Sequence, residues 1–127
     1  MTIAAEELSL LRINTTAFID ADSKQITLER RTTQSNGSGG FNETYTPLPE
    51  AQKMRLIPLG DKSPVRQTLD GEAAQPDYML LGEWNADLQR WDKFEDQGHR
   101  YQVLFIHEKS SYERKGEVKY IGDADAP

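Results

Sequence analysis

The chain has 127 residues, the size of one domain that can bury a core without metal or disulfide support. It contains no Cys, which excludes a disulfide scaffold, a thiolate metal site and a Cys nucleophile. Its net charge of −6 argues against a tight grip on nucleic acid, and no apolar stretch approaches the ~20 residues that span a bilayer.

The N-terminal residues 2–20 predict an amphipathic helix. Thr2 is placed to cap it, and Glu6 and Glu7 lie in its first turn, where the helix dipole favours anions. Thr15 and Thr16 are weak helix formers, so a break at residue 14 is compatible with the pattern. The expected apolar face comprises Leu8, Leu11, Phe18 and Ile19, widened by Ile13 and Ala17.

The hydrophobic period changes to two after residue 22. In the segment 24–33, Ile26 and Leu28 face one way, which is typical of a half-buried strand. Residues 35–42 have the composition of a flexible loop with no means of ordering itself. A second strand is expected over 52–58, and residues 59–76 then form a long polar loop.

The second half of the chain predicts further short strands. They cover residues 78–81, 91–95, 100–108 and 116–121, with a turn at 96–99, and the third of them is expected to be central because both its faces are apolar. We therefore expect a mainly β domain: a small antiparallel β-barrel or sandwich with an N-terminal α-helix and long loops. The expected divisions are a helix at 1–22, a β-barrel domain at 23–122 and a loose tail at 123–127.

No catalytic or metal-binding set emerges from the sequence. The two histidines, His99 and His107, lack a partner at ligand spacing. The acids Asp92, Glu95 and Asp96 flank a turn, where solvated carboxylates are ordinary. The mixed-charge run 113–119 has the character of a solvated hairpin, and the Gly-rich loop lacks the Lys-Ser/Thr of a phosphate cradle. We expect no enzyme activity, no cofactor and no metal.

Several segments together carry a resemblance. They are Gln25-Ile-Thr-Leu-Glu-Arg-Arg, a Gly-rich loop ending near Gly40, Lys53-Met-Arg-Leu-Ile-Pro, Tyr78-Met-Leu-Leu-Gly, the block from Asp92-Lys-Phe-Glu to Tyr101-Gln-Val-Leu-Phe-Ile-His-Glu, and Gly116-Glu-Val-Lys-Tyr-Ile. Across about residues 22–122 this order resembles the small head–tail joining proteins of tailed phages, the head-completion or stopper group. The N-terminal helix is less typical of the shortest members.

The resemblance implies a β-barrel protein that forms a homo-oligomeric ring, usually a hexamer, in the virion neck. The ring would be made in the bacterial host cytoplasm and would lie between the portal or adaptor and the tail. There it would retain packaged DNA and dock the tail, while its negative charge lets DNA pass without specific binding. No membrane partner is implied.

Two loops are the expected site residues under this resemblance. The loop 59–76 would line or close the channel as a gate, or contact an adjacent ring. The Gly-rich loop would reach a neighbouring subunit or a partner protein. The expected gating residues are Asp61, Lys62, Ser63, Arg66, Asp70 and Glu72, and the expected inter-subunit residues are Gly37, Gly39, Gly40 and Phe41.

Three other interpretations stay open. The first is a tail-terminator or adaptor ring protein of the same neck, which shares the partners and differs in position. The second is a small barrel that binds single-stranded nucleic acid, which needs basic grooves with stacked aromatic side chains. The third is a small hydrolase, which the lack of a catalytic set disfavours.

Overall fold

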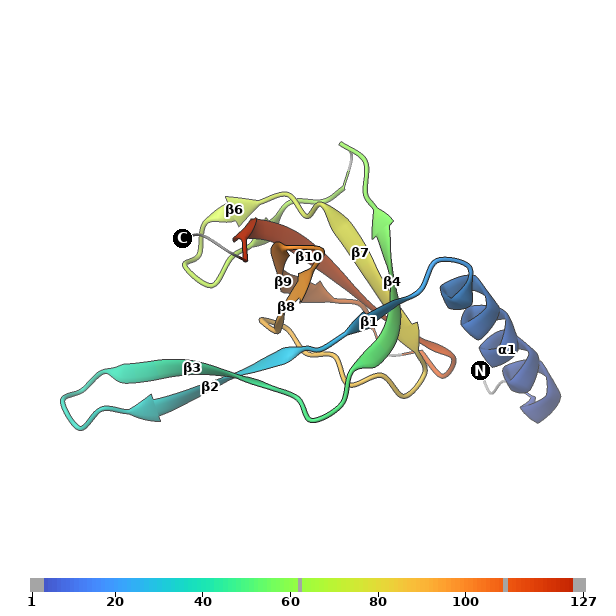
Figure 1. Cartoon of the computed structure of the whole chain (residues 1–127), viewed down its shortest axis with the longest axis horizontal. Coiled ribbons are helices and arrows are strands. Elements are labelled where there is room, and N and C mark those ends of the chain that lie inside the picture. Colours follow the sequence, from blue (N-terminus) through green and yellow to red (C-terminus); the bar gives the residue numbers. More distant parts are fainter. Residues whose placement is uncertain (1–3, 62, 109, 125–127) are drawn as a thin grey trace.

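The computed structural model describes residues 4–61, 63–108 and 110–124. One helix precedes a mainly β fold (Figure 1). The elements are α1 (Ala5–Asp20), β1 (Lys24–Ile26), β2 (Glu29–Ser35), β3 (Phe41–Pro47), β4 (Gln52–Pro58), β5 (Arg66–Gln67), β6 (Ala73–Ala74), β7 (Tyr78–Glu83), β8 (Lys93–Asp96), β9 (His99–Ile106) and β10 (Glu113–Asp123).

Eight of the strands form one curled antiparallel sheet in the order β1-β4-β7-β10-β9-β8-β2-β3. The chain between residues 24 and 35 meets both ends of the curl, because β1 pairs with β4 while β2 pairs with β8 through Glu29 and Lys93. Lys24 of β1 also lies 3.2 Å from Asp96 of β8. We call this meeting line the seam. The expected mainly β, barrel-like fold is confirmed.

The core fills the inside of the curl, as the period-two patterns predict. Phe94 stacks on Tyr101 with 5.1 Å between ring centroids, and Tyr78 meets Tyr101 edge-on at 5.6 Å. The fully buried apolar side chains include Ile26, Leu28, Met54, Leu80, Phe94, Val103 and Val118. The expected central strand, β9, lies between β10 and β8.

The turn between β8 and β9 follows the expected position. Asp96 pairs with His99, and the two residues between them, Gln97 and Gly98, both have positive φ, of 51° and 80°. Two-residue hairpin turns of this kind match the twist of the flanking strands. The turn therefore fixes the register that places Phe94 opposite Tyr101.

Three sequence expectations need correction. The helix is continuous through Asn14, and only Thr15 and Ile19 of it are buried, whereas Ile13 and Phe18 are 62% and 47% exposed. The helix contacts the sheet along a narrow ridge, so the expected broad apolar face is covered only in part. The expected cap, Thr2, and the tail residues 125–127 lie outside the described residues.

The second correction concerns β3, which the sequence analysis left within loops. Residues 41–47 pair with β2 along its whole length, from Glu29 opposite Pro47 to Ser35 opposite Phe41. The third concerns the polar loop 59–76, which contains the short hairpin of β5 and β6. Neither segment buries a side chain on either face, so the period-two signal that marks a half-buried strand is missing from them.

Candidate functional site

Two polar hairpins leave the curled sheet and contain all the expected site residues. We call residues 32–46 the arm and residues 59–76 the strap. The arm projects to one side of the sheet, and the strap crosses near β9 and β10 (Figure 1).

Arg66 fastens the strap to the sheet. Its Nε and Nη2 donate to the two carboxylate oxygens of Glu117 at 2.9 and 2.8 Å, and its guanidinium lies 3.6 Å from the centre of the Phe105 ring. Nε2 of His107 lies 2.7 Å from the same carboxylate. A bidentate Arg–carboxylate pair that also stacks on an aromatic ring is a strong, directional contact.

Glu117 is the centre of this cluster and is only 2% exposed. The hydrogen bonds from Arg66 hold the pKa of Glu117 below its ordinary value of 4.5, and the hydrogen bond with His107 acts in the same direction, against the effect of burial. The carboxylate is therefore kept ionised beneath the strap.

Local hydrogen bonds give the strap its own shape. Thr68 N–H donates to the Glu72 carbonyl at 2.9 Å and Gly71 N–H donates to the Thr68 carbonyl at 3.0 Å, which closes the β5–β6 turn. Ser63 Oγ donates to the Pro76 carbonyl at 3.2 Å and ties the two ends of the strap together. The strap is thus an ordered hairpin, contrary to the expected structureless loop.

The other expected strap residues face solvent. Asp61, Asp70 and Glu72 are exposed, and each of them makes no ion pair with another described residue. Lys62 lies outside the described residues. Among the gating residues that the structure describes, Arg66 alone makes a side-chain hydrogen bond or ion pair outside the strap, and the side chain of Ser63 bonds within it.

Asn36 orders the tip of the arm. Its Oδ1 accepts from Ser38 N–H at 2.9 Å and from Gly40 N–H at 3.2 Å, and its N–H donates to the Gly40 carbonyl at 3.1 Å. Gly37 and Gly39 have φ of 80° and 84°, a region that L side chains rarely adopt. The expectation that this loop cannot order itself is therefore wrong: a side chain and two glycines specify the turn.

Beyond its base, the arm is almost entirely exposed to solvent. Every residue from 32 to 46 is exposed except the half-buried Gly40 and Tyr45, and Phe41 is 74% exposed. At the base, Tyr45 Oη accepts from Gln102 Nε2 at 3.1 Å, and Lys93 lies 4.0 Å from the Tyr45 ring. The tip makes no such contact with the described sheet.

The acids that the sequence analysis interpreted as solvated divide into two kinds. Glu95 is exposed, but Asp92 is 1% exposed and accepts from Arg30 Nε at 2.8 Å and Nη2 at 3.1 Å. Arg30 also reaches Asp87 at 3.0 Å. Asp92 is a structural anchor beside the seam, as is Glu29, which accepts from Arg100 at 2.6 and 3.0 Å.

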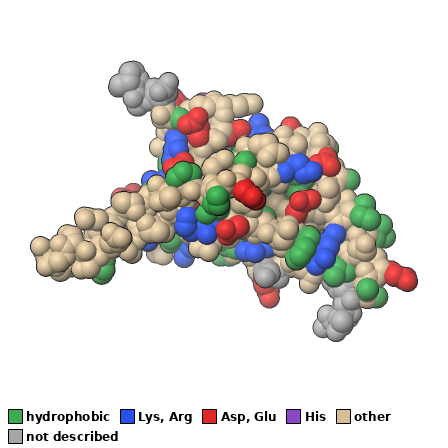
Figure 2. Space-filling model, turned by 60° about the horizontal axis from the view of Figure 1, so that its bottom comes forward, with side chains coloured by type: hydrophobic (Ala, Val, Ile, Leu, Met, Phe, Trp, Pro, Cys, Tyr) green, Lys and Arg blue, Asp and Glu red, His purple; other side chains and the backbone are tan. Residues whose placement is uncertain are grey.

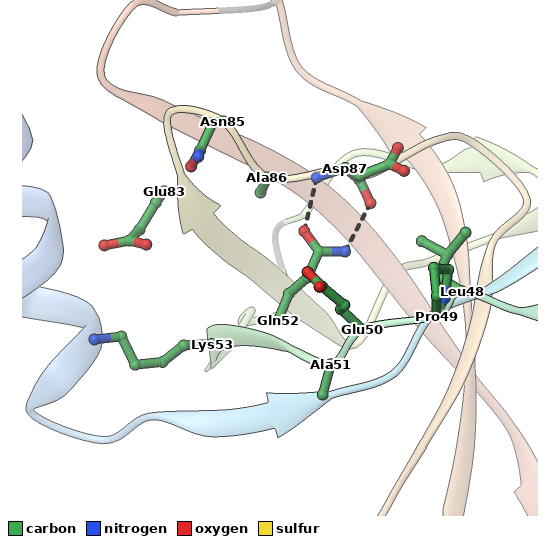
Figure 3. Close-up of a pocket in the computed structure, with 10 residues that line it drawn as sticks. All are labelled: Leu48, Pro49, Glu50, Ala51, Gln52, Lys53, Glu83, Asn85, Ala86 and Asp87. Carbon is green, nitrogen blue, oxygen red and sulfur yellow. Dashed lines mark hydrogen bonds between the residues drawn. The ribbon is translucent and has the colours of Figure 1, made fainter.

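A hollow of about 470 Å³ lies between the β3–β4 connection and the turn after β7 (Figure 3). Gln52 spans it: its Nε2 donates to the Asp87 carbonyl at 3.0 Å, and its Oε1 accepts from Asp87 N–H at 2.7 Å. The remaining polar groups, including Glu50 and Lys53, do not converge on one point in the figure. The hollow is a structural junction between two connections.

The sequence analysis missed Glu117, which it placed in a solvated run. Glu117 lies between Gly116 and Val118, on the outer face of β10, where acidic side chains are ordinarily exposed to solvent. What buries it is Arg66, 51 positions away along the chain.

Within the described residues, no three His, Asp or Glu side chains gather in a way that could hold a metal ion, and no helix there is long and apolar enough to cross a membrane. No protein-family model matches the chain, and no curated protein is similar enough to be counted as a relative.

Proposed function

We propose that this chain is a structural protein of a phage virion neck, which forms a ring between the portal or adaptor and the tail, retains packaged DNA and docks the tail. The observation that carries the proposal is the arm. A two-stranded hairpin alone is marginally stable in water, so an arm that leaves its own sheet gains most of its stability from a neighbour. Assembly proteins need such reaching elements.

Charge supports the same role. The chain carries 21 acidic and 15 basic residues, and Figure 2 shows acidic and basic side chains mixed over the body with no broad basic face in that view. A ring with this surface holds DNA by enclosing it, because it offers phosphate no clustered cations. The ring would contain no catalytic or cofactor site.

The strap is the proposed gate, with an adjacent ring as its other possible contact. Because Arg66 is already paired with Glu117, a swing of the strap into the channel requires that pair to break. The pair would thus hold the strap against the sheet until assembly or ejection displaces it.

The decisive experiment uses the virus or prophage whose genome carries the coding sequence. Purified particles should contain the chain by mass spectrometry, and cryo-electron microscopy should show its curled sheet as a ring between portal and tail. A ring at the tail end of the neck would identify a tail terminator, and one on the portal an adaptor. Particles without the chain, or a single copy in the neck, would refute the ring proposal.

The gate has its own test. Residues between Asp61 and Ala74 are replaced by a Gly-Ser linker, and heads are assembled with this variant. We expect these heads to package DNA and then lose it before tails attach. Heads that retain DNA normally would show that the strap is a contact surface.

A further inference from the structure

Because α1 contacts the sheet along a narrow line, an apolar groove remains between the helix and the sheet. Leu11 and Phe18 of the helix and Ile57 and Leu81 of the sheet line it, around a volume of about 380 Å³. Phe18 remains 47% exposed. Leu81 is buried at the floor of the groove, and Leu11 and Ile57 are half-buried along it. The Arg55 guanidinium stacks on the Phe18 ring at 4.2 Å, so Phe18 supplies the main apolar surface of the groove that stays in contact with water.

The arm tip carries the matching feature. Phe41 is 74% exposed, which is the highest fraction among the large hydrophobic residues that stand exposed in the described chain. It begins β3 and lies opposite Ser35, so it is held on a paired strand and not on a free end.

The arm and α1 lie at opposite ends of the molecule (Figure 1). A tip therefore cannot reach the groove of its own chain, but it can reach that of another copy. A contact between two different surfaces of identical chains is head-to-tail, and it closes into a ring or continues as a filament.

Charge permits this contact between two acidic copies. Residues 32–42 contain no charged side chain, and Figure 2 shows the protruding arm almost free of red and blue. On the groove side, Lys115 and Glu113 pair with each other at 3.3 Å, and the Arg55 guanidinium stacks on Phe18. An uncharged tip that meets a groove without unpaired acidic groups avoids the repulsion that two surfaces of the acidic body would encounter.

A stable interface takes about 800 Å² from each partner, or some 20–30 residues a side. The arm supplies residues 32–46, nearly all of them exposed, and the rest would come from the sheet beside the groove.

We propose that the arm tip of one copy, led by Phe41, docks in the groove between α1 and the sheet of the next copy. This inference rests on the proposed ring and names the contact that builds it. It also gives α1 a role: the helix forms one wall of the socket.

Cross-linking tests the contact directly, because the natural chain has no Cys. One protein carries Ser38→Cys at the arm tip and a second carries Asn14→Cys beside the groove. The two are mixed at high concentration with a short bismaleimide cross-linker. We expect a covalent heterodimer from this pair, and at least tenfold less when Phe41→Ser is added to the tip protein.

Matched controls make the result specific. Ser9→Cys is exposed on the same helix but lines the hollow on its other side, and it should cross-link to the tip at least tenfold less than Asn14→Cys. Val65→Ser, which removes another exposed apolar side chain, should leave the yield unchanged.

Three outcomes would overturn the inference: no heterodimer, a tip that links equally well to Ser9→Cys, or an Asn14→Cys protein that links mainly to itself, which would indicate helix-to-helix pairing. These outcomes leave the neck proposal to the particle experiment. Conversely, if the specific cross-link forms but virus particles lack the chain, the arm-to-groove contact would be supported and the proposed function in the virion neck would be refuted.

Discussion

The strap and the arm are both polar hairpins that leave the same sheet, yet they are stabilised in different ways. The strap returns to the sheet and buries a carboxylate under Arg66, whereas the arm extends outward with an exposed ion pair, Arg31–Glu43 at 3.1 Å, near its base. A fixed polar hairpin and a free one are thus distinguished by the burial of a single acid. The free one is the element available to a partner.

The largest expected effect is on the strap. Glu117→Gln leaves Arg66 and His107 without their shared carboxylate, and we expect it to lower the free energy of unfolding by about 3 kcal/mol, the low end for breaking a buried pair. The matched change on the arm, Glu43→Gln, should cost less than about 1 kcal/mol because that pair is exposed. Urea unfolding measures both. Equal costs would erase the distinction.

Acid should release the strap selectively. The folded pKa of Glu117 lies below its ordinary 4.5, so its pair with Arg66 stabilises the fold above that pH and is lost as pH falls through the folded pKa. The difference in unfolding free energy between the natural chain and Glu117→Gln should therefore be largest above pH 4.5 and shrink as the pH falls below it. Urea titrations at stepped pH give this difference; a constant value would mean that Glu117 does not titrate with folding.

Shortening the arm should barely affect folding. Replacing residues 33–43 by Asn-Gly joins the paired Thr32 and Thr44 through a two-residue turn. Because none of the removed side chains is buried, we expect a change of less than about 1 kcal/mol in unfolding free energy. A loss of several kcal/mol would show that the arm belongs to the folding unit.

The smallest effect concerns the tip. Asn36→Ala removes the acceptor of the Ser38 and Gly40 amides, and we expect faster hydrogen exchange at those amides with no measurable change in global stability. The matched strap variant, Thr68→Ala, removes the acceptor of the Glu72 amide. Its effect on exchange should be smaller, because Arg66 still fastens that hairpin.

The inner strands could be predicted from the sequence because their signal is local. Ile26 and Leu28, or Met54 and Leu56, alternate with polar neighbours, and such alternation specifies a face. β3 could not be predicted in this way, because both faces of its hairpin are exposed to solvent and its sequence shows no alternation of buried and exposed positions. Its Thr44-Tyr45-Thr46 core has β propensity, which was the one available clue.

The site residues show the same limit more sharply. Arg66 was among the expected gating residues, but its partner Glu117 could not be named, because nothing local links positions 66 and 117. Likewise Asp92 was taken as solvated, although Arg30 binds it across 62 positions. Pairs of opposite charge at long separation are chosen by the three-dimensional closure of the sheet, which a linear pattern does not encode.

The seam has a mechanical consequence. β2 belongs at once to the arm and to the line where the sheet closes, so tension on the arm runs along this one strand into the seam. There the load meets two bidentate ion pairs, Arg30 with Asp92 and Arg100 with Glu29, which sit side by side on adjacent residues of β2. When a neighbouring copy pulls on the arm, the load is therefore resisted by the ion pairs at the seam, where the copy's own sheet closes. The arm is thus anchored at the most strongly cross-linked line of the sheet.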